Sequence, residues 1–355
     1  MNRKHLLIPL LATALVTTAC GSSTSDGGAG APASSKTTIT WQSTGGDGQK
    51  QEIQAFQEPF TAKTGAKFNN VTSLSYIAQL QTMVDAKKTI WDVVHTGSYL
   101  AMAYCGKLFE KVDTSKMAAS LMPAGTTTEC SVPGTKFATE FAYNTTVYKD
   151  VVPTKIADFF DTKKFPGKRV VYNNPKGILE AALAADGVPP DQIFPMDVDR
   201  ALKKLGTIKS DLIFAPSYTA LQQNLVDKQA TMTLTLNGRL SIINDSGGTM
   251  APVWDFSSWD YDAWVVPKGA PNAKAAEEAI AFALEPAQLS KYSSLNGLIP
   301  VRSDIDPASI PLKENVKLFN AFTGAQRGQL ARQDAAYWAA NVAEVTKKWT
   351  AWQVG

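Results

Sequence analysis

Short runs of β-branched and aromatic residues alternate with amphipathic segments after residue 36. Residues 37–41, 67–71 and 90–95 predict strands, because each is a short apolar-rich run bounded by polar or glycine-rich residues. The intervening segments place apolar residues three or four positions apart, as at Ile53 and Phe56, which predicts helices. Strands that alternate with helices in this way are typical of a parallel α/β unit with right-handed crossovers. We therefore expect a ligand crevice at the carboxyl ends of these strands.

A second α/β unit follows with the same alternation. Its predicted elements, in chain order, are a strand at 169–172, helices at 178–185 and 197–205, a strand at 212–215, a helix at 217–228 and a strand at 231–236. We expect the last of these strands to end in a turn at Asn237 and Gly238, directly followed by Arg239. A strand at 263–266, a helix at 273–284 and a helical tail at 316–352, interrupted near Thr323 and Gly324, complete the pattern.

The N-terminus carries the pattern of an export signal. Arg3 and Lys4 precede an apolar run at 6–16, which is too short to span a bilayer as a helix but suits a signal peptide. Small residues then lead to Cys20. This order resembles a bacterial lipoprotein signal, in which the cysteine becomes the acylated N-terminus. Thr17 departs from that pattern, which prefers leucine there, and an ordinary signal peptide with an incidental cysteine is the alternative.

The residues after Cys20 are compatible with a tether. Residues 21–36 are Gly, Ser, Ala, Thr and Pro with one acid and one lysine, and they offer no side chains for a core. We expect a lipoprotein signal at 1–20, a flexible tether at 21–36, and a body held at the cell membrane outside the cytoplasm. No later run is long and apolar enough to cross a membrane.

Charge and histidine content exclude several classes of function. The chain has 35 Lys and Arg against 32 Asp and Glu, and removal of the signal with Arg3 and Lys4 leaves 33 − 32 = +1. A near-neutral chain of this kind has no electrostatic footprint for nucleic acid. His95 is the one histidine beyond residue 20, which argues against a multi-histidine metal site. We expect neither a metal nor a cofactor.

Cys105 and Cys130 are the remaining cysteines of the chain. Outside the cytoplasm, two such thiols usually oxidise to a disulfide, and we expect one here. The alternative, a reactive thiol, lacks a nearby base in the sequence.

An ordered set of short motifs runs through most of residues 37–305. The motifs lie at 91–94 with Tyr99 after it, 163–168, 181–183 with 186–188, 197–205, Asn237-Gly238-Arg239, 264–269 and 297–300. Together they resemble the solute-binding proteins of ABC importers, in particular the spermidine/putrescine-binding group. The resemblance implies a type II periplasmic-binding-protein fold, in which two α/β lobes close like a hinge over a solute.

The resemblance also implies where the lobes divide. Residues 37–140 with 262–306 would form one lobe, and 141–261 with 307–355 the other. The crossing strands would lie near 139–144 and 261–265. The partners would be a small solute and an ABC permease, and the protein would act as a monomer without catalysing a reaction.

The same resemblance points to the ligand. Polyamine binders of the group hold their cationic ligand with acids at positions occupied here by Asn174 and Gly177, and stack a tryptophan where Leu236 stands. This chain instead has Arg239, which could bind a carboxylate, and Asp262, which could bind an ammonium group. An Arg and an Asp at this spacing resemble those of γ-aminobutyrate binders of the same cluster. We therefore expect a small zwitterionic amino acid, with a polyamine as the alternative.

The remaining candidate ligand-binding residues are less specific. They lie at strand ends or on the expected crossing strands and are Trp41, Ser43, Ser98, Tyr99, Glu140 and Trp259. Glu140 is the acid that keeps a polyamine ligand open. Two further classes of function also stay open at this point. One is an anchored hydrolase, which would need a nucleophile or a carboxylate pair, and the other is a lipoprotein that presents a protein-binding surface.

Overall fold

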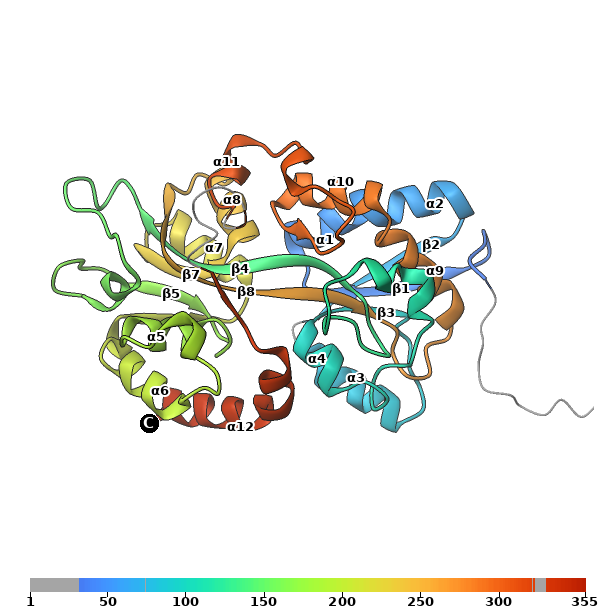
Figure 1. Ribbon diagram of the computed structural model, residues 1–355, viewed down its shortest axis with the longest axis horizontal. Helices are drawn as coiled ribbons and strands as arrows, with labels where there is room; N and C mark the ends of the chain where they lie inside the picture. Colours follow the sequence, from blue (N-terminus) through green and yellow to red (C-terminus); the bar gives the residue numbers. More distant parts are fainter. Residues whose placement is uncertain (1–31, 74, 321, 323–329) are drawn as a thin grey trace, which may run out of the picture.

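The computed structural model describes residues 32–73, 75–320, 322 and 330–355, and shows two lobes joined by long strands (Figure 1). The expected signal, the lipid attachment at Cys20 and most of the tether lie outside these residues, as do Thr323 and Gly324. In the described part of the chain, ten strands form one sheet with the path β2-β1-β3-β8-β4-β7-β5-β6, and β9 and β10 pair beside β4 and β8.

The first lobe, called lobe 1 below, contains a parallel unit built from the first three strands. Strand β1 (Thr38–Ser43) lies between β2 (Lys67–Thr72) and β3 (Val93–Gly97), parallel to both. The connecting and covering helices are α1 (Gly46–Glu52), α2 (Glu58–Thr64), α3 (Tyr76–Asp85), α4 (Ser98–Ala103), α9 (Ala273–Ala283) and α10 (Pro286–Asn296). A π-helical turn, Ile53–Gln57, joins α1 to α2.

The second lobe, lobe 2, repeats the arrangement. Strand β5 (Arg169–Tyr172) lies between β6 (Leu212–Ala215) and β7 (Met232–Leu236), again parallel to both. Its helices are α5 (Ile178–Ala185), α6 (Val198–Gly206), α7 (Tyr218–Val226), α8 (Asn237–Asp245), α11 (Glu314–Lys317) and α12 (Ala335–Val354).

Two long antiparallel strands cross between the lobes. Strand β4 (Pro133–Asn144) pairs with β8 (Met250–Val265) along most of its length, and the short β9 (Ile299–Pro300) pairs with β4. The far end of β8 pairs with β3 in lobe 1, while β4 pairs with β7 in lobe 2. The crossing segments are therefore longer than the six and five residues that the sequence indicated.

The structure corrects two predicted elements. Asn237 and Gly238 begin helix α8 instead of forming a turn, and the Asn237 side chain bonds to segments distant in the chain. Its Oδ1 accepts from the backbone N of Ala138 at 3.2 Å, and its Nδ2 donates to the carbonyl of Gly297 at 3.3 Å. The tail, expected to be helical with an interruption, also contains a strand, since β10 (Leu330–Arg332) pairs with β8 before α12 begins.

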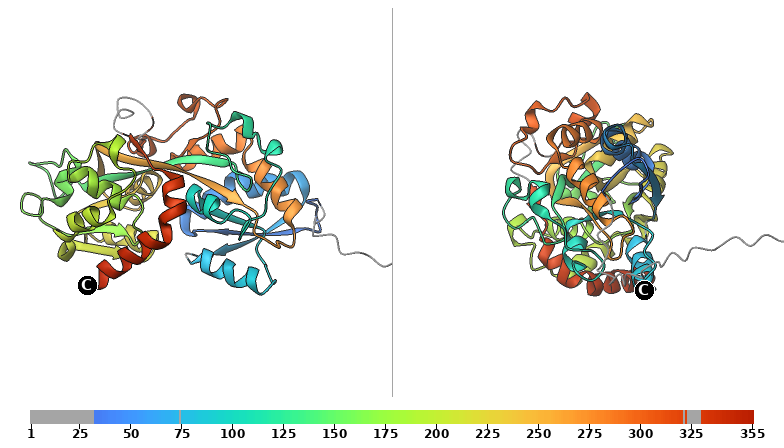
Figure 2. Two further views of the ribbon diagram at one scale, coloured as in Figure 1. Left: turned by 60° about the horizontal axis from the view of Figure 1, so that its bottom comes forward. Right: turned by 90° about the vertical axis from the view of Figure 1, so that its right-hand side faces the viewer.

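Helix α12 lies across the gap between the lobes (Figure 2). At its start, the Trp338 ring lies 6.2 Å from that of Tyr99 on α4 of lobe 1. Towards its end, Lys348 pairs with Asp199 on α6 of lobe 2 at 2.8 Å. Neither α12 nor any other helix in the described ranges is long and apolar enough to cross a membrane.

The buried apolar residues gather in separate cores on the two sides. In lobe 1, Trp41 and Trp264 pack against Phe56, with ring centroids 6.4 Å apart for the two tryptophans. In lobe 2, Phe141 and Trp338 belong to another core that covers β5 and β7. Each lobe thus buries its own apolar side chains, which leaves the polar strand ends between them for a ligand.

A disulfide joins Cys105 to Cys130 in lobe 1, in the segment between α4 and β4, with 5.5 Å between the Cα atoms. The segment is short of regular structure, and the bridge closes it into a loop across a sequence separation of 25 residues. Such a closure restricts the unfolded chain more than the folded one.

Replacing both Cys105 and Cys130 by serine should lower the free energy of unfolding by about 3 kcal/mol, the loop-closure value for a ring of this size. Urea unfolding of this variant and of the oxidised and reduced wild-type protein would measure it. The reduced wild-type protein serves as the control and should match the variant. Equal stability of all three samples would show that the bridge does not constrain the unfolded chain.

Candidate functional site

A cavity of about 180 Å³ lies between the lobes, where the carboxyl ends of β1 and β3 face the start of α8. The charged side chains that line it are Glu52, His95, Arg239 and Asp262. The wall also contains polar and aromatic residues, and the apolar side chains of Leu236, Ile242 and Leu298. The polar and aromatic residues are Ser43, Thr44, Gln51, Tyr76, Thr96, Phe137, Tyr218, Tyr292 and Asn296. The site therefore combines both signs of charge within one small aromatic enclosure.

Arg239 reaches this cavity from lobe 2. It lies in the first turn of α8, directly after β7, and its guanidinium sits 4.6 Å from the centre of the Tyr218 ring. Tyr218 is itself stacked on Tyr172 at 4.5 Å, so the cation rests on a fixed aromatic surface. The Nη2 atom of Arg239 donates to Oγ1 of Thr44 in lobe 1 at 3.3 Å. One side chain thus contacts both lobes, and its planar fork has the geometry that binds carboxylates bidentately.

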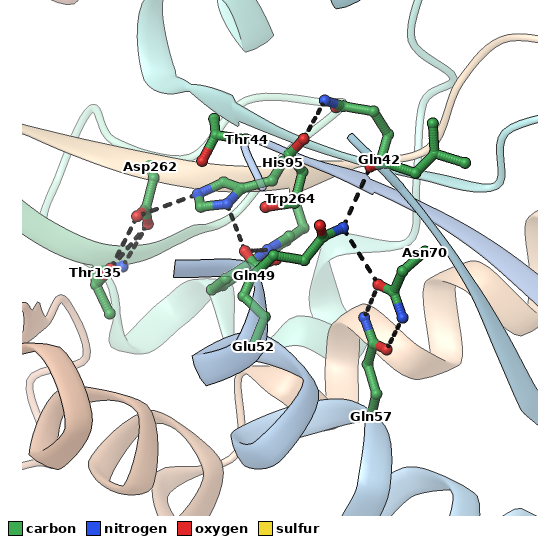
Figure 3. Close-up of polar contacts among 12 residues, drawn as sticks. Gln42, Thr44, Gln49, Glu52, Gln57, Asn70, His95, Thr135, Asp262 and Trp264 are labelled. Atoms are coloured by element: carbon green, nitrogen blue, oxygen red, sulfur yellow. Dashed lines mark hydrogen bonds and ion pairs between the residues drawn. The ribbon is translucent and has the colours of Figure 1, made fainter. Parts of the chain in front are cut away.

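Opposite charges are gathered around His95 in lobe 1 (Figure 3). The Nδ1 atom of His95 lies 2.5 Å from Oε1 of Glu52, and Nε2 lies 3.3 Å from Oδ2 of Asp262. His95 is on β3 and Asp262 is on β8, two residues beyond the partner of His95 in the antiparallel ladder. Diagonal neighbours of this kind are within reach of each other's side chains.

Each carboxylate has further donors. The backbone N and Oγ1 of Thr135 both donate to Oδ1 of Asp262 at 3.0 Å. Trp264 Nε1 donates to Oε1 of Glu52 at 3.3 Å. Asp262 is therefore held on two sides, by Thr135 from β4 and by His95 from β3. The carboxylate of Glu52 is fully buried.

Helix α1 carries Glu52 and is fixed to the neighbouring strand by amide side chains (Figure 3). Gln49 donates to the carbonyl of Val71 at 3.2 Å and accepts from Thr72 at 2.9 Å. Gln57, just beyond α1, exchanges two hydrogen bonds with Asn70, at 2.9 and 2.7 Å. These bonds set the position of α1 against β2 and thereby place Glu52 below His95.

The two carboxylates control the protonation of His95. Burial alone would lower the pKa of His95, but the negative charge of Glu52 and the hydrogen bond to Asp262 outweigh it and raise this pKa to about 10. His95 is consequently an imidazolium at neutral pH. Burial also raises the pKa of Tyr76 to about 12 and that of Tyr292 well above its usual value, so both phenols are neutral and can donate.

A second cavity of about 140 Å³ adjoins the first and shares Phe137, Tyr218 and Leu236 with it. Lys176 lines it, and its Nζ pairs with Asp260 of β8 while lying 5.0 Å from the Tyr99 ring. The carboxylate of Asp260 also accepts from Ser98 at 2.8 Å. The polar groups that remain around this cavity belong to uncharged side chains, chiefly those of Asn174, Thr235 and Gln333.

The structure places the sequence-predicted site residues in different environments. Arg239, Asp262 and Ser43 line the first cavity, Tyr99 lines the second, and Ser98 contacts Asp260 beside it. The other three lie away from both linings. Trp41 is fully buried in the lobe 1 core, and Glu140 is fully buried on β4. The Trp259 ring lies 5.6 Å from Nζ of Lys136 and 5.7 Å from the guanidinium of Arg332.

Sequence reasoning did not select Glu52, His95, Tyr218 or Lys176. His95 offered a signal, because it is a lone histidine at the end of a strand that was expected to border the crevice. Glu52 offered none, since its place depends on how α1 packs against β2. Within the described ranges, no group of His, Cys, Asp and Glu side chains is arranged to hold a metal ion.

Comparisons with known proteins agree on one class. The sequence profile of the bacterial extracellular solute-binding proteins matches residues 55–320. A gamma-aminobutyric acid-binding protein from Pseudomonas aeruginosa is 30% identical over 322 residues, 88% of this chain and 90% of that protein. The solved structure of a GABA receptor is 32% identical, with a TM-score of 0.78 and coverage of 89% and 97% of the two chains. A substrate-binding protein of an ABC transporter from Bradyrhizobium japonicum is 29% identical, with a TM-score of 0.80 and coverage of 89% and 99%.

The raised pKa of His95 makes stability depend on pH. The folded-state value is about 10 against the ordinary 6.5, so the stabilising contribution is complete below pH 6.5 and is lost as the pH rises through about 10. The free energy of unfolding of the wild-type protein should fall between pH 7 and pH 10, by a few kcal/mol more than that of His95→Gln. Urea unfolding at several pH values would measure this. Parallel curves for the two proteins would contradict the expectation.

Gly238 allows α8 to approach α10 closely, since a Cβ at this position would lie 2.8 Å from the carbonyl oxygen of Asn296. Gly238→Ala should therefore lower the free energy of unfolding by about 1–3 kcal/mol. Gly206→Ala in α6 is the matched control, because its Cβ would meet nothing closer than 3.8 Å. Thermal or urea unfolding compares the two, and a Gly238→Ala protein as stable as the control would show that α8 has room to move.

Proposed function

Because this chain belongs to the family of bacterial extracellular solute-binding proteins, we propose that its solute is a small zwitterionic amino acid of the γ-aminobutyrate kind, delivered to an ABC permease. One observation carries the choice of solute. A single small cavity presents a guanidinium, Arg239, from lobe 2 and a carboxylate, Asp262, from the strand that crosses into lobe 1.

The chemistry of these two groups matches the two ends of such a ligand. Arg239 would bind the carboxylate through paired N–H donors, aided by the hydroxyl groups of Ser43 and Thr44 nearby. Asp262 and the faces of Tyr76 and Tyr292 would surround the ammonium group, which carboxylates and aromatic rings both attract. The cavity of about 180 Å³ is smaller than the roughly 300–1,000 Å³ of pockets for drug-sized ligands, which favours a short solute.

The relatives support the same solute. The binding protein from Pseudomonas aeruginosa and the solved receptor both carry γ-aminobutyrate in their names, at 30% and 32% identity and over most of the chain. A polyamine is the alternative that the sequence left open. Arg239 argues against it, because a half-buried guanidinium beside a polycation is repulsive. An anchored hydrolase is disfavoured by the family, whose members are transport proteins.

The proposal extends to the setting of the protein. The family places it outside the cytoplasm. We infer from the sequence alone that Cys20 carries the lipid that holds it at the membrane, with the segment 21–36 as the tether. Two lobes that close around one cleft form a complete binding unit, so a monomer suffices for capture.

A thermal-shift panel of γ-aminobutyrate, other ω-amino acids, proline, putrescine and spermidine tests the proposed solute. At a hundredfold excess over its Kd, a ligand adds about 2.7 kcal/mol of stability, which raises the melting temperature measurably. We expect shifts with the zwitterions and none with the diamines. A shift with putrescine or spermidine alone would reverse the assignment of the ligand.

Arg239→Gln should weaken binding of γ-aminobutyrate at least about thirtyfold, since it removes one partner of a desolvated charge pair. Isothermal titration calorimetry measures the Kd. Arg200→Gln is the matched control, because Arg200 pairs with Asp186 on the exposed side of lobe 2 and should leave the Kd unchanged. Equal affinity of Arg239→Gln and the control would place Arg239 outside the ligand contacts.

A further inference from the structure

His95 is the central charge of a buried row of three ionisable side chains. Both of its ring nitrogens face a carboxylate oxygen, Glu52 Oε1 at 2.5 Å and Asp262 Oδ2 at 3.3 Å. A neutral imidazole has one N–H and one lone pair, so one of these contacts would set a lone pair against a carboxylate. Two carboxylate oxygens at these distances favour a proton on each nitrogen, which makes His95 a cation within the cavity wall.

The charges that line the first cavity then cancel. Arg239 and His95 contribute two positive charges, and Glu52 and Asp262 contribute two negative ones. We propose that His95 is the residue that sets the net charge of this cavity to zero, and that it thereby makes the protein select net-neutral zwitterions over diamines. This inference rests on the proposed function and assigns its selectivity to a side chain other than the Arg–Asp pair that would contact the two ends of the ligand.

Selectivity follows from the cost of desolvating charge. A zwitterion brings one charge of each sign into the cavity and leaves its total at zero, so each ligand charge is met by an opposite one. A diamine brings two positive charges into a cavity whose own total is zero, and Arg239 and His95 both repel them. Without His95 the cavity would carry one net negative charge, and the penalty for a second ammonium group would fall.

Among the residues that the structure describes, the charged side chains that act on His95 are Glu52 and Asp262. The Trp264 ring lies 5.3 Å from the His95 ring, and the phenol of Tyr292 packs on Trp264. Tyr292 stays neutral because burial raises its pKa. In the adjoining cavity, Lys176 and Asp260 form an ion pair and contribute no net charge.

The alternative is that His95 only holds α1 against β8. Variants that remove the charge of His95, and then restore the neutrality of the cavity, distinguish the two roles. His95→Gln leaves a net charge of −1, and the double variant His95→Gln/Glu52→Gln returns the cavity to zero. Glu52→Gln alone is the control for the loss of Glu52, because the pKa of His95 falls without that carboxylate. An amide at position 52 can still accept from Trp264 Nε1, so the double variant keeps that bond while losing both charges.

Calorimetric titration of the four proteins at pH 8 with γ-aminobutyrate and with putrescine provides the test. The ratio of the two Kd values should move at least tenfold towards putrescine in His95→Gln and should not move towards putrescine in Glu52→Gln. In the double variant it should return to within about threefold of the wild-type ratio. A purely structural role predicts instead that the double variant binds both ligands worse than either single variant.

The outcomes separate the two proposals. A wild-type protein that binds none of the zwitterions in the panel would overturn both the proposed function and this inference. A wild-type protein that binds γ-aminobutyrate, with a ratio unmoved in His95→Gln, would overturn this inference alone. The protonation of His95 can also be measured directly in the ligand-free protein. The ¹⁵N chemical shifts of protein labelled at histidine should show a doubly protonated ring at pH 8, and the His95→Gln protein assigns the signal. A neutral ring would overturn the inference.

Discussion

The arrangement of the site depends on one strand, β8, which pairs with β3 in lobe 1 and with β4 along the crossing segment. A strand of 16 residues whose backbone groups are paired at both ends has a fixed register, and a slip of one residue would turn every side chain to the opposite face. Asp260, Asp262 and Trp264 lie on the same face because side chains alternate along a strand. That face supplies Asp262 to the first cavity, Asp260 to the ion pair with Lys176 beside the second cavity, and a tryptophan to the lobe 1 core.

Charge compensation shapes both cavities, although in different ways. In the second cavity, Lys176 and Asp260 neutralise each other directly, so the space beside them offers uncharged polar groups. In the first cavity, the charges are spread over Arg239 in lobe 2 and the row of Glu52, His95 and Asp262 in lobe 1. Buried ions are costly unless they are paired, and a row that shares one cation between two carboxylates pairs both at once.

The contacts between the lobes include a polar one in the cleft and an aromatic one further away. Arg239 contacts Thr44 across the cleft, whereas Tyr99 of α4 packs against Trp338 of α12 at the far edge. A ligand that binds both sides of the cleft would add contacts to the first group without rebuilding the second. The crossing strands and α12 thus hold the lobes together, while the cleft residues remain available for the solute.

The sequence by itself determined the α/β alternation, the helix at 178–185, the family and the presence of Arg239 and Asp262, because strand and helix periodicities and short motifs are local properties. It did not determine the length of β8, the strand β10 or the helix that begins at Asn237, since these depend on pairing between residues distant in the chain. Trp41 illustrates the limit of prediction from sequence. It lies near the end of a strand, and only the packing of the core that contains Trp264 and Phe56 decides that it is buried. The sequence also could not predict the row of Glu52, His95 and Asp262. These residues belong to α1, β3 and β8, and they become neighbours only when the tertiary fold brings those elements together.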